Sequence, residues 1–242
     1  MEAVAQLVER QIVALEVSRV RAPSVSLNNN RNMISKIVHY CEFGETSNKN
    51  SQIDNWKQIL TGYIFIRWNE ANFKLEDNPY AARTYSANRI DLLENYVRVW
   101  SLYNFGGITL DVNVELIQNF DSVLPLPYFI GLRNDNQTIN QDVFGSTAGH
   151  EFFGKVLDFY NSLEDNEIDI TLTEVMTIIL GQYYYFYADV PDMFVDSNKY
   201  ITLFTRQLFS PQMYDYQGKL VKNYENEHSI ARTVFHNKDS AV

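Results

Sequence analysis

The segment from Ala87 to Leu116 constrains the fold most, because it joins a helical pattern to a strand pattern across two adjacent glycines. In residues 87–105, ANRIDLLENYVRVWSLYNF, apolar side chains recur at helical spacing, and Gly106 and Gly107 then end the helix. In residues 108–116, ITLDVNVEL, apolar and polar residues alternate, as in a strand with one buried face. The segment therefore predicts a long helix that leads directly into a half-buried strand.

Strand and helix patterns also alternate along the rest of the chain. Residues 34–44 and 63–69 are rich in β-branched and aromatic side chains, which predicts two strands, with a short helix at residues 53–60 between them. Residues 149–163 and 171–182 have helical patterns, and the C-terminal part contains strand-like segments around loops. Because strands alternate with helices, the sequence predicts a mixed α/β sandwich rather than a β-barrel.

The charge and the cysteine content limit the classes of partner. The chain of 242 residues has 20 basic and 30 acidic residues and a net charge of −10, which argues against binding to nucleic acid. An acidic protein still binds phosphates when a divalent cation lies between them. The single cysteine, Cys41, excludes an intrachain disulfide, and no apolar stretch is long enough to span a bilayer. We therefore expect no transmembrane segment and a cytoplasmic location, either free or peripheral at the membrane.

The first 32 residues form a separate N-terminal extension. Glu9 and Arg10 interrupt its apolar pattern, so it is not a secretory signal. The run VAQLVER resembles the peptide that results when a tRNA gene is translated, in which case Met33 is the true start. The alternative is an ordinary amphipathic N-terminal helix. We expect residues 1–32 to be non-native or disordered and residues 33–242 to form one domain.

The polar face of the predicted strand offers oxygen ligands. Asp111 and Asn113 are two residues apart, so a regular strand places both side chains on one side. Mg²⁺ and Mn²⁺ prefer oxygen ligands and often bind one or two carboxylates together with substrate phosphates. Acidic residues on the wet face of an amphipathic strand are also common. The pattern alone leaves open a metal site and a merely solvated strand face.

Several segments, in the same order, resemble glycosyltransferase family 32, the capsular-polysaccharide and mannosyltransferase-like group. ENYVRVWSLYNFGG and TLDVNVE are similar to the family's SDxxRxxxLxxxGG and YLDxDVE, and ISKIVHYCEFG to its opening IPKIIHYxWFG. NWKQILTGYIFIRWNEANF resembles the helix and strand that follow, and FGSTAGHEFFGKVLDFY the later segment in which a GHP turn starts a helix. The resemblance covers most of residues 34–160. It implies a GT-A fold, an α/β fold with a mixed central sheet flanked by helices.

The resemblance also implies a reaction. The protein would transfer a hexose from a UDP- or GDP-linked sugar to a glycan or lipid-linked acceptor in surface polysaccharide biosynthesis, with retention of anomeric configuration. Asp111 and Asn113 would hold Mn²⁺ or Mg²⁺, and His236 would add a metal or diphosphate contact. Asp111 and Arg98 would carry the catalysis.

The donor would be held by two further elements of the resemblance. Ile37, His39 and Tyr40 on the first strand would meet the base and ribose. Asn95 and Arg98 on the long helix would contact the donor sugar or its phosphates. Together these residues form the expected cofactor-binding set.

Each of these roles has a structural alternative. Arg98 can instead pair with Glu94 on an exposed helix face, because the two residues are four apart. His39 can be a core histidine with satisfied hydrogen bonds, and His236 can be a surface residue near the terminus.

The chain departs from the family pattern at positions that matter for the chemistry. Asn95 and Asn113 stand where the family has aspartates, so two carboxylates expected near the donor are missing. Thr109 and Glu42 replace aromatic residues of the pattern, and Ala241 replaces a tryptophan. Two hypotheses follow. The protein is a working transferase with a weakly bound metal, or it is a weakened or inactive relative that binds nucleotide sugars or a protein partner.

Overall fold

The computed structural model describes residues 33–44, 52–133, 138–164, 169–188, 200–214, 220–223 and 225–233. The extension predicted for residues 1–32 lies outside the described residues, and so does His236. Within the described residues, no helix is both long and apolar enough to cross a membrane.

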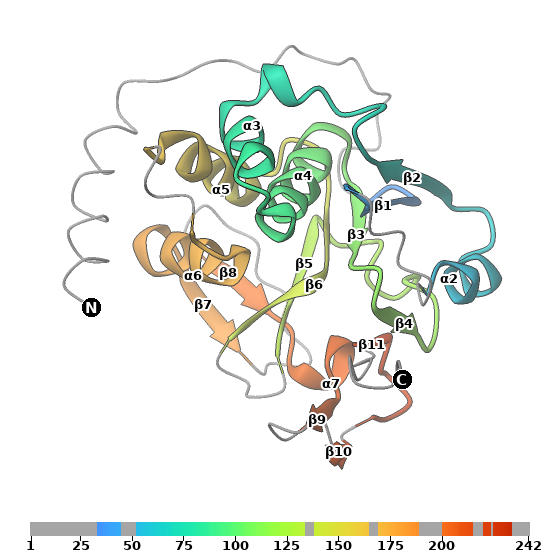
Figure 1. Ribbon diagram of the computed structural model, residues 1–242. Helices are drawn as coiled ribbons and strands as arrows, with labels where there is room; N and C mark the ends of the chain where they lie inside the picture. Colours follow the sequence, from blue (N-terminus) through green and yellow to red (C-terminus); the bar gives the residue numbers. More distant parts are fainter. Residues whose placement is uncertain are drawn as a thin grey trace.

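A five-stranded sheet in the order β2-β1-β3-β6-β5 lies at the centre of the fold (Figure 1). The first three strands of this order are parallel, whereas β6 is antiparallel to both of its neighbours. The prediction of an α/β fold with a mixed central sheet is therefore confirmed. The strands are β1 (Ile37–Cys41), β2 (Ile64–Trp68), β3 (Gly107–Leu110), β5 (Tyr128–Leu132) and β6 (Ile139–Ser146).

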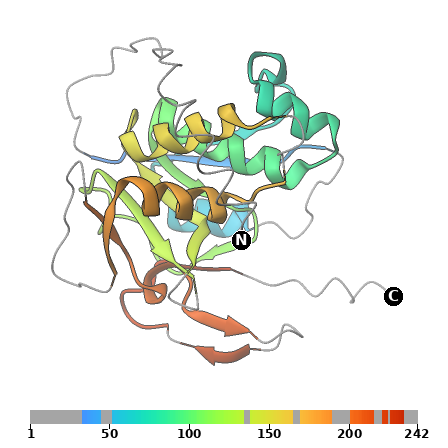
Figure 2. The same ribbon diagram turned by 90° about the vertical axis from the view of Figure 1, so that its left-hand side faces the viewer.

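Helices cover both faces of this sheet, because each face is apolar. In Figure 1, α4 and α2 lie on opposite sides of β3, and Figure 2 shows α5 and α6 side by side. One core contains Tyr96 of α4 and Phe144 of β6, and a second core on the other face contains Trp56 of α2 and Ile108 of β3. The helices are α2 (Ile53–Ile59), α3 (Pro79–Ser86), α4 (Ile90–Phe105), α5 (Glu151–Ser162), α6 (Leu172–Tyr183) and α7 (Arg206–Phe209).

The helices at residues 53–60, 87–105, 149–163 and 171–182 were expected and are confirmed to within a few residues as α2, α4, α5 and α6. The helix α3 was not expected, since it has only eight residues. It begins with Pro79, whose fixed φ suits the first turn of a helix. The remaining elements are η1 (Leu75–Asp77), β7 (Tyr185–Ala188), β8 (Tyr200–Leu203), β9 (Gln212–Tyr214) and β10 (Leu220–Asn223).

The continuous strand predicted for residues 108–116 is wrong, because a turn divides it. The strand β3 ends at Leu110, and β4 (Val114–Leu116) pairs separately with β11 (Ala231–Thr233). Between them, the Val114 N–H donates to the Asp111 carbonyl oxygen at 2.9 Å, and the Asn113 N–H donates to the Asp111 carboxylate at 3.0 Å. Asp side chains that accept from the backbone two residues on favour such turns. The side chain of Asp111 thus ends the strand at the position of the expected site.

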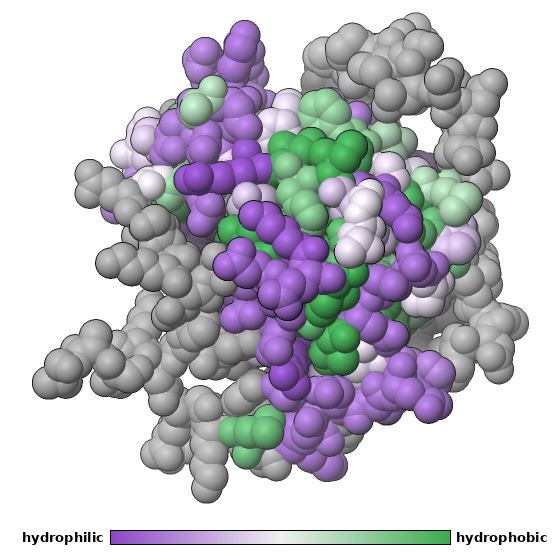
Figure 3. Space-filling view, turned by 90° about the vertical axis from the view of Figure 1, so that its right-hand side faces the viewer, coloured by the Kyte–Doolittle hydropathy of each residue, from purple (hydrophilic) through white to green (hydrophobic). Residues whose placement is uncertain are grey.

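The strand β2 forms one edge of the sheet and carries exposed apolar surface. Ile64 at its start is 61 % exposed. In Figure 3, which shows the side of the molecule with β2 and α2, apolar patches lie between polar ones. Arg67 on β2 forms an ion pair with Glu42 at 2.8 Å. A charged residue of this kind discourages pairing of an edge strand with another chain.

Two glycines make the turn from α4 into β3 possible. Gly106 has φ of +65° and Gly107 has φ of +110°, a region that other residues rarely occupy. A Cβ atom on Gly107 would lie 2.5 Å from the carbonyl oxygen of Ile37 on the neighbouring strand β1. The absence of a side chain therefore lets β3 start directly beside β1.

We expect the change Gly107→Ala to lower the free energy of unfolding by at least ~2 kcal/mol, because it adds a backbone clash to an unfavourable φ. The matched control is Gly62→Ala, where φ is +81° but no atom lies within 4 Å of the added Cβ. Urea denaturation monitored by circular dichroism measures both. Equal losses in the two variants would show that the contact with Ile37 does not matter.

Candidate functional site

The chain order of the sheet identifies one place where a ligand is expected. From β1 the chain passes to β2 on one side of it and then to β3 on the other side. In open α/β sheets, ligands bind outside the carboxyl ends of the strands where the direction of strand order reverses. The residues that follow the carboxyl ends of β1 and β3 are Glu42 and Asp111. The candidate site is built around them.

Arg98 from α4 is the positive charge of this site. Its side chain is 5 % exposed, and its Nη1 lies 3.6 Å from Oδ2 of Asp111. Nη1 also donates to the Gln141 carbonyl oxygen at 3.0 Å, and Nη2 donates to Oδ1 of Asn95. The structure thus brings together Arg98, Asn95 and Asp111 from the expected set. The alternative of an exposed helix face is wrong for Arg98, because α4 buries this residue against the sheet.

Asp111 and Asn113 lie in contact, although the turn and not a regular strand brings them together. The Asn113 Nδ2 donates to Oδ1 of Asp111 at 3.0 Å, so the amide oxygen is turned away from the carboxylate. The Asp111 side chain is 26 % exposed, which leaves it accessible to a ligand. Its hard oxygen atoms suit Mg²⁺ or Mn²⁺, and the Asn113 amide can present its oxygen instead of its nitrogen by rotating about χ2.

Acidic ligands for a metal ion are few at this site. Among the residues that the structure describes, no group of three or more His, Cys, Asp or Glu side chains could hold an ion. His236 lies outside the described residues, so its role stays a prediction. An ion held here by the described residues would therefore need phosphate oxygens or water to complete its coordination, as Mg²⁺ commonly does.

Two acidic residues at the site were not predicted. Glu94 on α4 accepts a hydrogen bond from the Phe43 N–H at 3.2 Å. Burial raises the pKa of Glu94 to about 7, although the Phe43 N–H and Arg98 oppose this shift. Asp142 on β6 accepts from the Thr233 hydroxyl at 2.9 Å. Its pKa is also raised, first by burial and then by the charge of Asp111.

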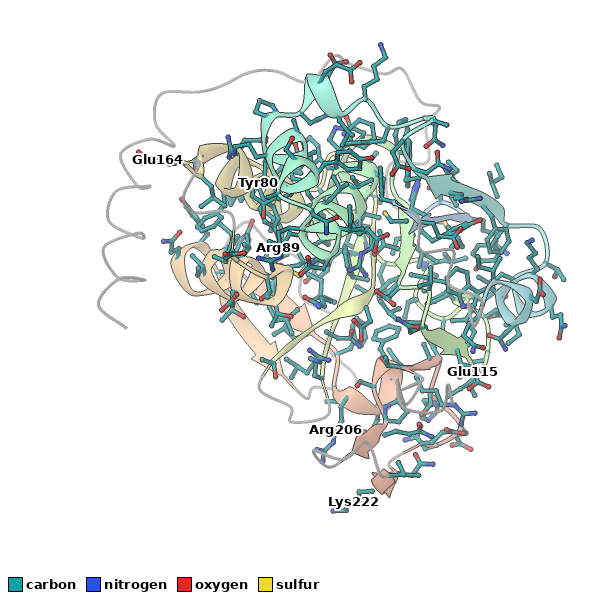
Figure 4. All side chains as sticks on the ribbon, in the orientation of Figure 1. Tyr80, Arg89, Glu115, Glu164, Arg206 and Lys222 are labelled. Carbon is teal, nitrogen blue, oxygen red and sulfur yellow. The ribbon has the colours of Figure 1, made fainter. Side chains whose placement is uncertain are left out.

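Glu115 is the last polar residue on the polar face of the predicted strand, and its side chain points away from Asp111. It forms an ion pair with Arg232 of β11, with Oε2 and Nε 2.9 Å apart. Figure 4 shows Glu115 beside β4, at the margin of the molecule. Glu115 therefore fixes the pairing of β4 with β11 and does not add a carboxylate to Asp111.

The first strand contributes mainly core side chains. His39 is fully buried, with Nε2 2.9 Å from the Gly106 carbonyl oxygen, while the Trp68 Nε1 donates to its Nδ1 at 3.2 Å. This geometry fits the alternative of a core histidine. Tyr40 packs edge-on against Trp56 on the opposite face of the sheet. Ile37 is at the amino end of β1, away from Asp111. Nucleotide contacts by these three residues stay a prediction.

One comparison with known proteins, at the level of sequence, supports the resemblance to glycosyltransferases. No family model matches the chain. Over 149 residues, 55 % of this chain, it is 26 % identical to inositol phosphoceramide mannosyltransferase 2 of Schizosaccharomyces pombe. It spans 39 % of the length of that relative. Among solved structures, the PaToxG glycosyltransferase matches with a TM-score of 0.49 and 19 % identity, over 62 % of this chain and 69 % of that one. Membership of family 32 stays a prediction.

The buried His39 predicts how stability depends on pH. Burial lowers the pKa of its imidazole from 6.5 to about 4, although the hydrogen bond to Gly106 opposes this shift. Below pH 6.5 the unfolded chain therefore binds a proton that the folded chain does not. The folded state thus loses stability as the pH decreases. Between pH 7.5 and pH 5 this group should account for a loss of about 2 kcal/mol.

We expect the change His39→Gln to remove that part of the pH dependence. Urea denaturation at pH 7.5 and pH 5 measures it as a difference between the two proteins. The control His228→Gln alters a histidine whose side chain is 77 % exposed and should keep the slope of the unaltered protein. A slope for His39→Gln that equals the slope of the unaltered protein would contradict the neutral, buried state of His39.

Proposed function

We propose that this chain is a glycosyltransferase that transfers a hexose from a nucleotide-diphosphate sugar to a glycan or lipid-linked acceptor. The observation that carries the proposal is the cluster of Asp111, Asn113 and Arg98 beside the carboxyl ends of β1 and β3. A buried arginine and an accessible carboxylate at a point of strand-order reversal suit a ligand that carries both phosphates and hydroxyls. The sequence similarity to a mannosyltransferase supports the same reading.

In this proposal the chain's own residues bind and orient the donor. Asp111 and Asn113 hold Mn²⁺ or Mg²⁺ through oxygen atoms, and Arg98 holds Asp111 in place from the helix side. The divalent cation, when bound, stabilises the negative charge that develops on the departing diphosphate. Asn95, which accepts from Arg98, keeps the guanidinium aimed at Asp111 and at the donor.

The name of the similar protein guides the choice of the donor sugar to test first. Mannose is the first sugar to test, because the similar protein is a mannosyltransferase that is named for a phosphoceramide. We extend the proposal to retention of anomeric configuration, to surface polysaccharide biosynthesis and to a cytoplasmic or peripheral membrane location. Each of these finer statements rests on the resemblance described above.

A second function is favoured by one observation. The Asn113 amide donates to Asp111, so the pair satisfies part of its own hydrogen bonding without an ion. Asn95 is likewise neutral where the pattern has an aspartate. A weakened or inactive relative that binds nucleotide sugar without transferring it would show the same features.

Calorimetric titration of the full chain with UDP and with GDP, with and without Mn²⁺, tests the proposal. We expect binding that requires Mn²⁺ and that weakens at least ~10-fold, about 1.4 kcal/mol, in the isosteric variant Asp111→Asn. The control Asp158→Asn makes the same chemical change on α5 and should bind as the unaltered protein does.

Two results would go against the proposal. Binding of neither nucleotide under either condition would contradict a donor site at Asp111. Binding without hydrolysis of any UDP- or GDP-linked hexose, assayed by release of the free sugar, would favour the second function over transfer.

A further inference from the structure

Asp111 and Asp142 lie opposite each other on neighbouring strands at the candidate site. In the pairing of β3 with β6, Leu110 lies opposite Val143, and the same register continues to Asp111 and Asp142. The Asp111 N–H donates to the Asp142 carbonyl oxygen at 2.9 Å, which confirms this register. Residues directly opposite in an antiparallel pair extend their side chains to the same face, with Cβ atoms roughly 4.5–5.5 Å apart. Like charges in such a pair destabilise the sheet.

Burial makes the repulsion between the Asp111 and Asp142 carboxylates cost more free energy than the same repulsion between two surface carboxylates. Asp142 is only 9 % exposed, and among the residues that the structure describes the hydrogen bond to its carboxylate comes from the neutral Thr233 hydroxyl. Leu110 and Val143 belong to the core on the α2 face, so the alternating positions Asp111 and Asp142 lie on the face that α4 covers, where Arg98 approaches Asp111.

Arg98 alone does not balance these charges. Its contact with Asp111 is long, at 3.6 Å, and its Nη1 and Nη2 are directed to Gln141 and Asn95. Its Nε is buried and finds no acceptor within the part of the chain that the structure describes. Asn95 and Asn113 are neutral. Glu94 adds a further carboxyl group near Arg98, and Arg133 adds a second positive charge near Asp142. A divalent cation between Asp111 and Asp142 would offset the repulsion between their two carboxylates.

We propose that Asp142 is the second carboxylate ligand of the divalent cation that Asp111 binds. The inference rests on the proposed function, in which that cation also contacts the donor diphosphate. Asp142 supplies the negative charge that Asn113 lacks, so the neutral turn residue does not leave the ion with a single acidic ligand. The hydroxyl of Thr233 orients the Asp142 carboxylate through its hydrogen bond from β11.

This assignment fits the coordination habits of the metal. Mg²⁺ is usually held by one or two carboxylates, with phosphates and water in the other positions. Two facing aspartates provide that number, and the described residues offer no larger set of acidic, histidine or cysteine ligands. The Arg98 guanidinium beside Asp111 then remains to offset the negative charge of the phosphates.

Binding of Mn²⁺ to the full chain in the presence of UDP or GDP, followed by electron paramagnetic resonance of the free ion, tests the inference. We expect Asp142→Asn to weaken Mn²⁺ binding at least ~10-fold, comparably to Asp111→Asn. The control Asp158→Asn should leave Mn²⁺ affinity unchanged. The variant Asp142→Asn still offers an oxygen to the Thr233 hydroxyl, so its melting temperature without metal should not fall, whereas the rise in melting temperature on adding Mn²⁺ should be smaller than in the unaltered protein.

A second variant keeps the carboxylate and removes only what orients it. Thr233→Val should weaken Mn²⁺ binding by a smaller factor than Asp142→Asn. If Asp142→Asn fails to fold, unaltered Mn²⁺ affinity in Thr233→Val would overturn the inference.

The outcomes separate this inference from the proposed function. Unchanged Mn²⁺ affinity in Asp142→Asn, together with a loss in Asp111→Asn, would overturn the role of Asp142 and leave the donor site intact. Nucleotide binding by a protein that binds no Mn²⁺ under any condition would overturn the role of Asp142 and would also contradict the metal requirement of the proposed function. If the unaltered protein binds neither Mn²⁺ nor nucleotide, both the inference and the proposed function fail.

Discussion

The site depends on the contacts that the buried Arg98 guanidinium makes. A buried arginine is tolerated only where its charge and its hydrogen bonds are met, and removal of a partner leaves an expensive unpaired charge. Arg98 reaches from α4 to Asp111 and to the Gln141 carbonyl oxygen, so it ties the helix to β3 and β6 together. The two strands that carry Asp111 and Asp142 are thereby held in one position relative to α4. Burying the Arg98 guanidinium costs stability, and binding of an anionic ligand explains why the protein keeps this charge at the site.

Two local features position the backbone around the contact between Arg98 and Asp111. Gly106 and Gly107 let α4 pass into β3 without a gap, so the helix that carries Arg98 and the strand that ends at Asp111 are consecutive. The carboxylate of Asp111 then ends the strand by accepting from the Asn113 N–H. The same side chain thus shapes the turn and faces the site, which links local structure directly to ligand chemistry.

The sequence predicts what depends on short-range patterns and misses what depends on pairing between distant segments. The helix at residues 87–105 and the glycine pair that ends it follow from spacing alone, whereas Arg98 and Asp111 were expected at the site because of the family resemblance. The break after Leu110 was missed because the apolar alternation continues through the turn, and only a side-chain hydrogen bond of Asp111 ends the strand. Asp142 was missed because its place at the site comes from the register of β6 against β3, which no local pattern encodes.

The central claim is that a divalent cation and a nucleotide bind where β3 ends, between the sheet and α4. The most direct measurement is a crystal structure of the full chain with Mn²⁺ and UDP or GDP, using the anomalous scattering of manganese. The account predicts an anomalous peak within bonding distance of the Asp111 carboxylate, with the nucleotide phosphates beside it and near Arg98. A bound nucleotide at any other place in the fold, with no manganese at Asp111, would contradict it.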